Sequence, residues 1–180
     1  MTGFGRKLKG KKRIKNINIS SKKIINQAFL LHSKGNIKEA AKYYQYLINQ
    51  GVQDHRVFSN YGLIQKVIGK LNEAELSIRK AIELNPNEAE LHSNLGGILN
   101  SLGKLKEAEI TTRKAIELNP KYSNAHYNLG NILRDLKKLS EAAISFKKAI
   151  KLKPNFFEAH RDLGICLYLL KDIDSAIKSI

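Results

Sequence analysis

The sequence predicts an all-α protein, a right-handed solenoid of stacked antiparallel helix hairpins. The first reason is a repeat: AIELNPNEAELHSNLG at 81–96 returns as AIELNPKYSNAHYNLG at 115–130 and as AIKLKPNFFEAHRDLG at 149–164, each copy 34 residues after the last. The second reason is that residues with small side chains recur at fixed phases of this period. Because a 34-residue period is typical of stacked helical hairpins, we expect no β-strand.

The repeat divides the chain into a basic tail at 1–20 and a repeat domain at 21–180. Aligning the copies on Pro86, Pro120 and Pro154 gives units at 21–54, 55–88, 89–122 and 123–156 and a partial unit at 157–180. The first unit departs from the pattern, with Ala28, Leu47 and Val52 where later units have glycine, alanine and proline. A terminal repeat is usually atypical, because one of its faces meets water.

Each hairpin is expected to contain two helices that cross closely. Glycine inside a helix costs about 1 kcal/mol against alanine, so glycine at one phase of four units implies a crossing too close for a side chain. Gly69 and Gly103 fall between the two helices, where a turn favours a left-handed residue. Each proline ends a second helix, because it disfavours helical geometry in the residue before it. The small residues are Gly62, Gly96, Gly130 and Gly164, then Ala40, Ala74, Ala108, Ala142 and Ala176, then Ala81, Ala115 and Ala149.

These residues resemble the pattern of the tetratricopeptide repeat (TPR) family, which places small residues at the eighth, twentieth and twenty-seventh positions of a unit and proline at the thirty-second. The resemblance covers residues 21–180. It implies a TPR superhelix in which the first helix of every unit lines a concave groove. It also implies a protein-interaction scaffold, with a protein or peptide as the partner.

The sixth position of the units has amide or carboxylate side chains, and the resemblance implies that they point into the groove. A carboxamide can both donate and accept, so a row of them suits the backbone of an extended peptide. This row is similar to the asparagine ladder of the TPR region in O-linked N-acetylglucosamine transferases. The alternative is that these side chains brace neighbouring helices. The row consists of Asn26, Asn60, Asn94, Asn128 and Asp162.

Specificity in such a groove is expected from the residues beside the row. The carboxylate clamp of chaperone-binding TPR domains is not expected, because Ser59, Ser93 and Tyr127 stand where its first lysine would be. The further groove residues that we predict are Ser93, Tyr127, Asn100, Asn131, Arg134 and Arg161.

The histidines and the cysteine, which are residue types common in metal and catalytic sites, have structural roles in this interpretation. His92, His126 and His160 occur once per unit, and helices pack roughly 8–10 Å apart, so they cannot converge on one metal ion. Cys166 lies in an apolar run, where a thiol usually acts as a small hydrophobe. No Ser-His-Asp order, phosphate-binding glycine loop or Cys-x-x-Cys pair occurs. We therefore expect no metal, no cofactor and no catalysis by these 180 residues.

The charge of the chain is concentrated at its N-terminal end. The formal net charge is +16, and residues 1–38 contain eleven Lys or Arg and no acidic residue. Like charges together with glycine predict that the tail at 1–20 is disordered. The alternative is weak contact with a polyanion or an anionic membrane, at about 1 kcal/mol for each basic residue. The residues concerned are Arg6, Lys7, Lys9, Lys11, Lys12, Arg13 and Lys15.

Two expectations concern the setting of the chain. No apolar run approaches the roughly 18 residues that cross a bilayer, and the N-terminus lacks the apolar stretch of a secretory signal, so we expect a cytoplasmic protein. At the other end we expect a second helix of the last unit, with Ile173, Ile177 and Ile180 at an open apolar edge available for self-association.

The alternative function is the substrate-recognition region of a larger transferase-type enzyme, whose catalytic domain would follow residue 180.

Overall fold

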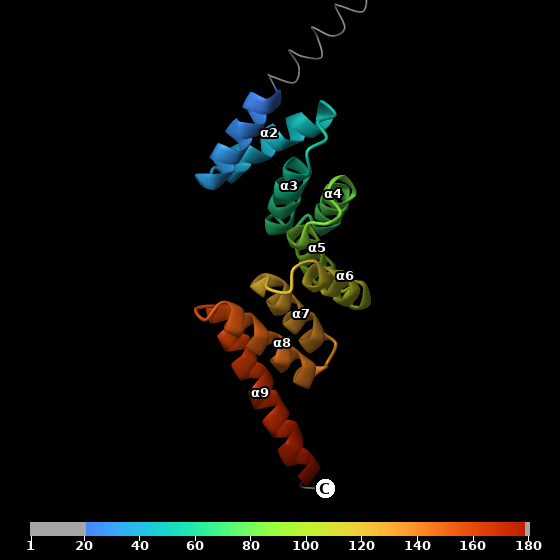
Figure 1. Cartoon of the computed structure of the whole chain (residues 1–180), viewed down its shortest axis with the longest axis vertical. Coiled ribbons are helices and arrows are strands. Elements are labelled where there is room, and N and C mark those ends of the chain that lie inside the picture. The colour runs from blue at the N-terminus through green and yellow to red at the C-terminus, as the bar shows by residue number, and fades with distance from the viewer. Residues whose placement is uncertain (1–20, 179–180) are drawn as a thin grey trace, which may run out of the picture.

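The computed structural model describes the backbone of residues 21–178 and the side chains of residues 21–171, and all regular structure within this part is α-helical. The hairpins follow one another along the long axis of the molecule (Figure 1), which confirms the predicted all-α solenoid. None of the described helices combines the length and apolar character that spanning a bilayer requires. Helical residues 21–33 come first, followed by α2 (Ile37–Asn49), α3 (His55–Val67), α4 (Leu71–Leu84), α5 (Ala89–Ser101), α6 (Leu105–Leu118), α7 (Ser123–Asp135), α8 (Leu139–Leu152) and α9 (Phe157–Lys178).

The turn inside each hairpin requires one left-handed residue. Gly69 and Gly103 have φ angles of 80° and 74°, as the sequence predicts. Unit four has Lys137 at the same position with a φ of 64°. A residue with a side chain pays roughly 1–2 kcal/mol for this conformation, so the packing of α8 against α7 must hold it there.

The connection between hairpins is fixed by the prolines and the histidines. The second helices α4, α6 and α8 each end two residues before the proline. The Nε2 atoms of His92, His126 and His160 then lie 2.8, 2.9 and 2.8 Å from the carbonyl oxygens of the prolines six residues earlier. These histidines therefore hold the inter-unit loops against the next helix, which agrees with their predicted structural role.

The glycines at the eighth position allow the two helices of a hairpin to cross closely. A Cβ atom added to Gly62 would lie 3.0 Å from Ile78, and one added to Gly130 would lie 2.5 Å from the ring of Phe146. At Gly96 the added atom would collide with the Thr112 hydroxyl. The close crossing predicted for units two to four is therefore confirmed.

Unit five differs from the prediction. The structure has one continuous helix, α9, from Phe157 to Lys178, where a hairpin was expected. Lys171 stands at the turn position but does not take the left-handed conformation that Lys137 takes in unit four, and the helix continues through it. Consequently nothing lies within 4 Å of a Cβ added to Gly164, so the predicted crossing at this glycine is wrong. The side chains of Ile173 and Ile177, and all of Ile180, lie outside the described residues, so the apolar edge stays a prediction.

The core runs from unit to unit along the stack. Tyr44 and Leu47 are fully buried in the first hairpin, and Ile98 and Ile132 join the middle units. Cys166 is fully buried beside Phe146 and Leu133, and burial raises the pKa of its thiol. The thiol therefore acts as an apolar group, as predicted.

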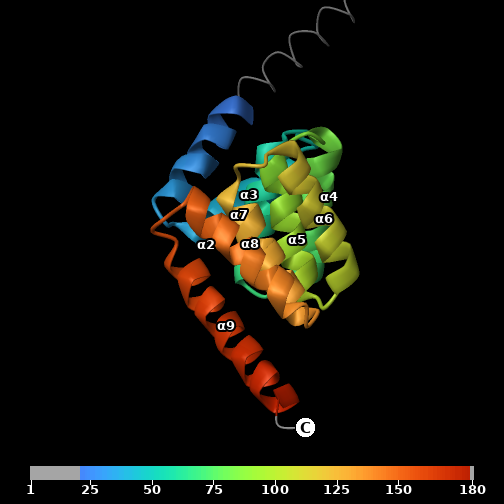
Figure 2. The same cartoon turned by 60° about the horizontal axis from the view of Figure 1, so that its bottom comes forward.

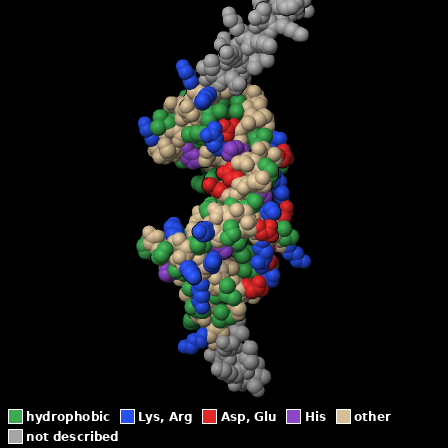
Figure 3. Space-filling view, in the orientation of Figure 1, with side chains coloured by type: hydrophobic (Ala, Val, Ile, Leu, Met, Phe, Trp, Pro, Cys, Tyr) green, Lys and Arg blue, Asp and Glu red, His purple; other side chains and the backbone are tan. Residues whose placement is uncertain are grey.

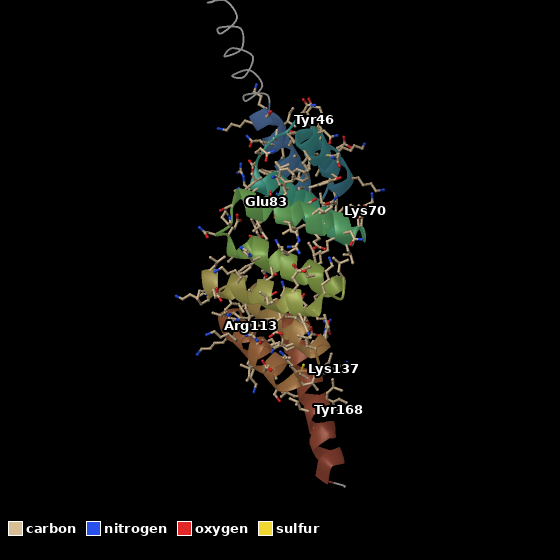
Figure 4. The ribbon with its side chains drawn as sticks, turned by 90° about the vertical axis from the view of Figure 1, so that its right-hand side faces the viewer. Tyr46, Lys70, Glu83, Arg113, Lys137 and Tyr168 are labelled. Atoms are coloured by element: carbon tan, nitrogen blue, oxygen red, sulfur yellow. The ribbon has the colours of Figure 1, made fainter. Side chains whose placement is uncertain are left out.

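Ion pairs link successive second helices on the outer side of the stack, which faces the viewer in Figure 4. Glu109 accepts from Arg113 at 2.8 Å and from Lys138 of the next unit at 3.2 Å. One unit earlier, Glu75 accepts from Arg79 at 2.8 Å and from Lys104 at 2.7 Å. The side chains of both glutamates are mostly buried, with exposed fractions of 11% for Glu75 and 16% for Glu109.

These contacts lower the pKa of both carboxyl groups. At Glu75, burial raises the pKa, but the hydrogen bonds from Lys104 and Arg79 outweigh it. At Glu109 the hydrogen bond from Arg113 has the largest effect, and Lys138 adds to it against the opposing effect of burial. Because the folded pKa is depressed, the stabilisation is present above the unfolded pKa near 4.5 and is lost as the pH falls through the folded value.

Gly130 and Gly164 test the crossing directly. Gly130→Ala is expected to destabilise the protein by about 1–3 kcal/mol, because the methyl group would overpack Phe146. Gly164→Ala is the matched control and should stabilise by up to about 1 kcal/mol through helix propensity alone. Urea unfolding of both variants measures the difference, and equal free energies of unfolding would contradict the assignment.

The ion pairs can be tested by acid titration of stability. Glu109→Gln is expected to lower the free energy of unfolding at neutral pH by about 1 kcal/mol, since two charge-assisted hydrogen bonds weaken while their cations stay half-exposed. The difference from the wild type should shrink as the pH falls below about 4.5. Glu117→Gln, at an exposed site on α6, is the control. A pH-independent difference for Glu109→Gln would argue against the mechanism.

Candidate functional site

The stack curves, and the hollow of the curve is the candidate site. Figures 1 and 2 show helical residues 21–33 and the start of α9 on the same side of the middle units, and Figure 3 shows the surface hollowed on that side between them. A hollow of about 330 Å³ lies there between α3, α5, α7 and α9. It brings together seven of the predicted groove residues and three others. Its lining consists of Lys66, Gly97, Asn100, Ser101, Tyr127, Asn128, Asn131, Arg134, Arg161 and Asp162.

The other predicted groove residues lie elsewhere. Asn26 is exposed and borders a separate hollow of about 820 Å³ beside Asp54 and Arg56. Asn60 and Asn94 are half-buried on α3 and α5, and the Nδ2 atom of Asn94 is buried without a hydrogen-bond partner among the described residues. Ser93 is only 1% exposed, so it lies under the groove and not in its lining.

Asn128 joins two units. Its Nδ2 donates to the carbonyl oxygen of Ser93 at 3.1 Å and lies 3.0 Å from the Ser93 hydroxyl. These bonds connect α7 to α5, so in unit four the sixth position braces neighbouring helices. The bracing alternative therefore describes Asn128 in this structure.

Asp162 has a similar structural role at the next unit. It is 3% exposed and accepts from the Tyr127 hydroxyl at 2.9 Å and from Arg161 at 2.9 Å, while Arg134 lies 3.7 Å away. Burial, reinforced by this carboxylate, raises the pKa of Tyr127, so its hydroxyl remains a donor. The Tyr127 ring also packs on Phe156 with centroids 4.8 Å apart. The carboxylate is thus surrounded by donors of the protein itself.

Two amide oxygens in the hollow remain without donors. Asn100 donates through Nδ2 to Asp135 at 3.0 Å, but its Oδ1 is buried and has no partner among the described residues. The Oδ1 of Asn131 is in the same situation. An unsatisfied buried acceptor costs about 1–3 kcal/mol, so a ligand that brings N–H donors would recover this energy.

The sequence interpretation missed Lys66. This lysine lies on α3 at the same phase of the repeat as Asn100 and Arg134, 34 residues apart, so the repeat could have revealed it. It is half-buried, and burial lowers the pKa of its ammonium group. No described carboxylate forms an ion pair with it. The hollow therefore contains a cation without an internal partner.

Some predictions cannot be placed. Arg6, Lys7 and the other basic residues of the tail lie outside the described residues, so their contact with a polyanion or membrane stays a prediction. Among the described side chains, no group of three His, Cys, Asp or Glu residues lies together in a way that could hold a metal ion.

The repeats match models of one protein family. Three models described as tetratricopeptide repeat match residues 55–88, 78–110 and 123–156. The first and last of these ranges have the bounds of two predicted units. With the hairpin architecture described above, the chain belongs to the tetratricopeptide repeat family. Comparison with curated proteins gave no match.

Solved structures with the same fold agree with this assignment. MamA residues 41 to the end from Desulfovibrio magneticus RS-1 is 21% identical, with a TM-score of 0.73 over 88% of this chain and 89% of that one. YrrB, a TPR protein with an unusual peptide-binding site, is 24% identical, with a TM-score of 0.69 over 90% and 83%. The first TPR domain of Spaghetti (RPAP3), bound to the HSP90 peptide SRMEEVD, is 28% identical, with a TM-score of 0.63 over 66% and 94%.

The brace between units three and four can be tested by substitution. Asn128→Ala is expected to lower the free energy of unfolding by about 1 kcal/mol and to speed hydrogen exchange in α7, because it removes the bonds to Ser93. Asn72→Ala, at an exposed site on α4, is the control. If Asn128→Ala has the same stability as the wild type, these bonds do not brace the units.

Proposed function

We propose that this protein is an interaction scaffold that binds an extended peptide segment of a partner protein in the concave groove. The observation that carries the proposal is the pair of buried acceptors without donors, Asn100 Oδ1 and Asn131 Oδ1, on neighbouring first helices in one hollow. An extended peptide presents backbone N–H groups at regular intervals, whatever its side chains are. It therefore supplies the donors that these acceptors lack once the two amide groups rotate toward the hollow.

The proposed contacts differ from the asparagine ladder expected at the sixth position. Asn128 and Asp162 already bond within the protein, so the peptide would bind at the ninth and twelfth positions, where Asn131 and Asn100 lie. Each hydrogen bond contributes roughly 0.5–1.5 kcal/mol to the binding free energy, before the cost of ordering the peptide is subtracted. We expect micromolar affinity, with release fast enough for a reversible assembly.

The structural relatives support the class of partner. The RPAP3 domain, which has the same fold and is 28% identical to this chain, is bound to the HSP90 peptide SRMEEVD. The alternative, a substrate-recognition region of a larger transferase-type enzyme, depends on the ladder similarity alone. The coding sequence after residue 180 would test it.

The groove can be tested with peptides selected by display of random decapeptides on the full chain. Asn131→Ala is expected to weaken the binding of a selected peptide by roughly 2–10-fold, because one acceptor is removed. Asn72→Ala on α4 should leave the affinity unchanged. Fluorescence anisotropy measures both. Failure to enrich any peptide, or equal affinity of Asn131→Ala and the wild type, would count against the groove.

A further inference from the structure

The most unusual charge in the groove is the ammonium group of Lys66. Of the three cationic side chains that line the hollow, Arg134 and Arg161 both lie against Asp162, at 3.7 and 2.9 Å. Arg134 also lies 3.5 Å from Asp135. Lys66 has no ion pair or hydrogen bond with any described residue.

Gly97 gives this ammonium group its position. A Cβ atom added to Gly97 would lie 3.3 Å from Lys66 Nζ and 3.6 Å from Asn128 Nδ2. The Lys66 side chain therefore extends from α3 across the bare backbone of α5, toward the amide of Asn128 on α7. A side chain at position 97 would crowd this path, so the glycine keeps the ammonium group in the floor of the groove.

The carboxylate that lines the hollow, that of Asp162, cannot form an ion pair with Lys66. Asp162 is 3% exposed and already accepts from Tyr127 and Arg161. A half-buried ammonium group without a counter-ion is unfavourable, because it has lost part of its hydration without gaining a partner. The lining thus has three cationic side chains and one carboxylate, so the hollow has an excess of positive charge.

We propose that Lys66 binds a carboxylate of the incoming peptide, so that the groove selects acidic segments. This inference rests on the proposed function. An Asp or Glu side chain would pair with Lys66 Nζ, while the backbone N–H groups on either side donate to Asn100 and Asn131. Charge-assisted hydrogen bonds are about twice as strong as neutral ones, and partial burial protects this one from salt. The lysine thus supplies the sequence preference that the amides alone cannot give.

The test compares the wild-type chain with Lys66→Met in the same decapeptide display. The wild type is expected to enrich peptides with Asp or Glu at one fixed position, and Lys66→Met should lose this preference. One enriched peptide is then synthesised with blocked termini, together with its Glu→Gln or Asp→Asn counterpart. The wild type should bind the acidic peptide about tenfold more tightly than the amide counterpart. Lys66→Met should bind the two peptides with equal affinity.

Matched variants separate charge from structure. Lys66→Arg should retain the acidic preference, and Lys70→Met, at an exposed lysine preceding α4, should behave as the wild type. A peptide with a free C-terminal carboxylate and no acidic side chain shows whether the terminus can replace the side chain. Enrichment without acidic residues, or the same acidic preference in Lys66→Met, would overturn this inference and leave peptide binding intact. Failure to enrich any peptide would overturn both.

Discussion

The close crossing of two helices over a glycine is the contact on which each hairpin depends. The side chain that covers the glycine differs between units, from Ile78 to Thr112 to Phe146, but the bare backbone beneath it is the same. Because this crossing holds the second helix on one side of the first, the opposite side of the first helix is free. The groove exists because the small residues are used on the packing side, which leaves the polar positions of α3, α5 and α7 for contact with other molecules.

Units are also joined to each other by polar contacts on two sides. On the outer side, Glu109 bonds to Lys138 of the next unit. On the inner side, Asn128 bonds back to Ser93, and Tyr127 bonds forward to Asp162. Each of these contacts connects nearest neighbours only. Stability in such a stack is close to a sum over units and their interfaces, so the inner polar residues contribute to the shape of the groove as well as to its chemistry.

The sequence could predict the parts of this fold that depend on local geometry. The glycines of the turns, the prolines and the crossing at Gly130 follow from backbone rules that hold in any helical hairpin. The partners of polar side chains depend on the rotation between units, which no single unit encodes. For this reason the sequence leaves peptide contact and bracing as alternatives for the sixth position, and only the structure shows that Asn128 bonds within the protein. The continuous helix of unit five does not follow from Lys171 alone, because Lys137 stands at the same position of unit four and makes the turn.

The contacts between the histidines and the proline carbonyls have a consequence for the tautomer of each ring. A carbonyl oxygen can only accept, so the ring nitrogen of His92 or His160 that faces it must carry hydrogen. The loop between successive hairpins is therefore fastened by a donor on the first helix of the next unit. A side chain without a donor at that position would leave the proline carbonyl without this bond.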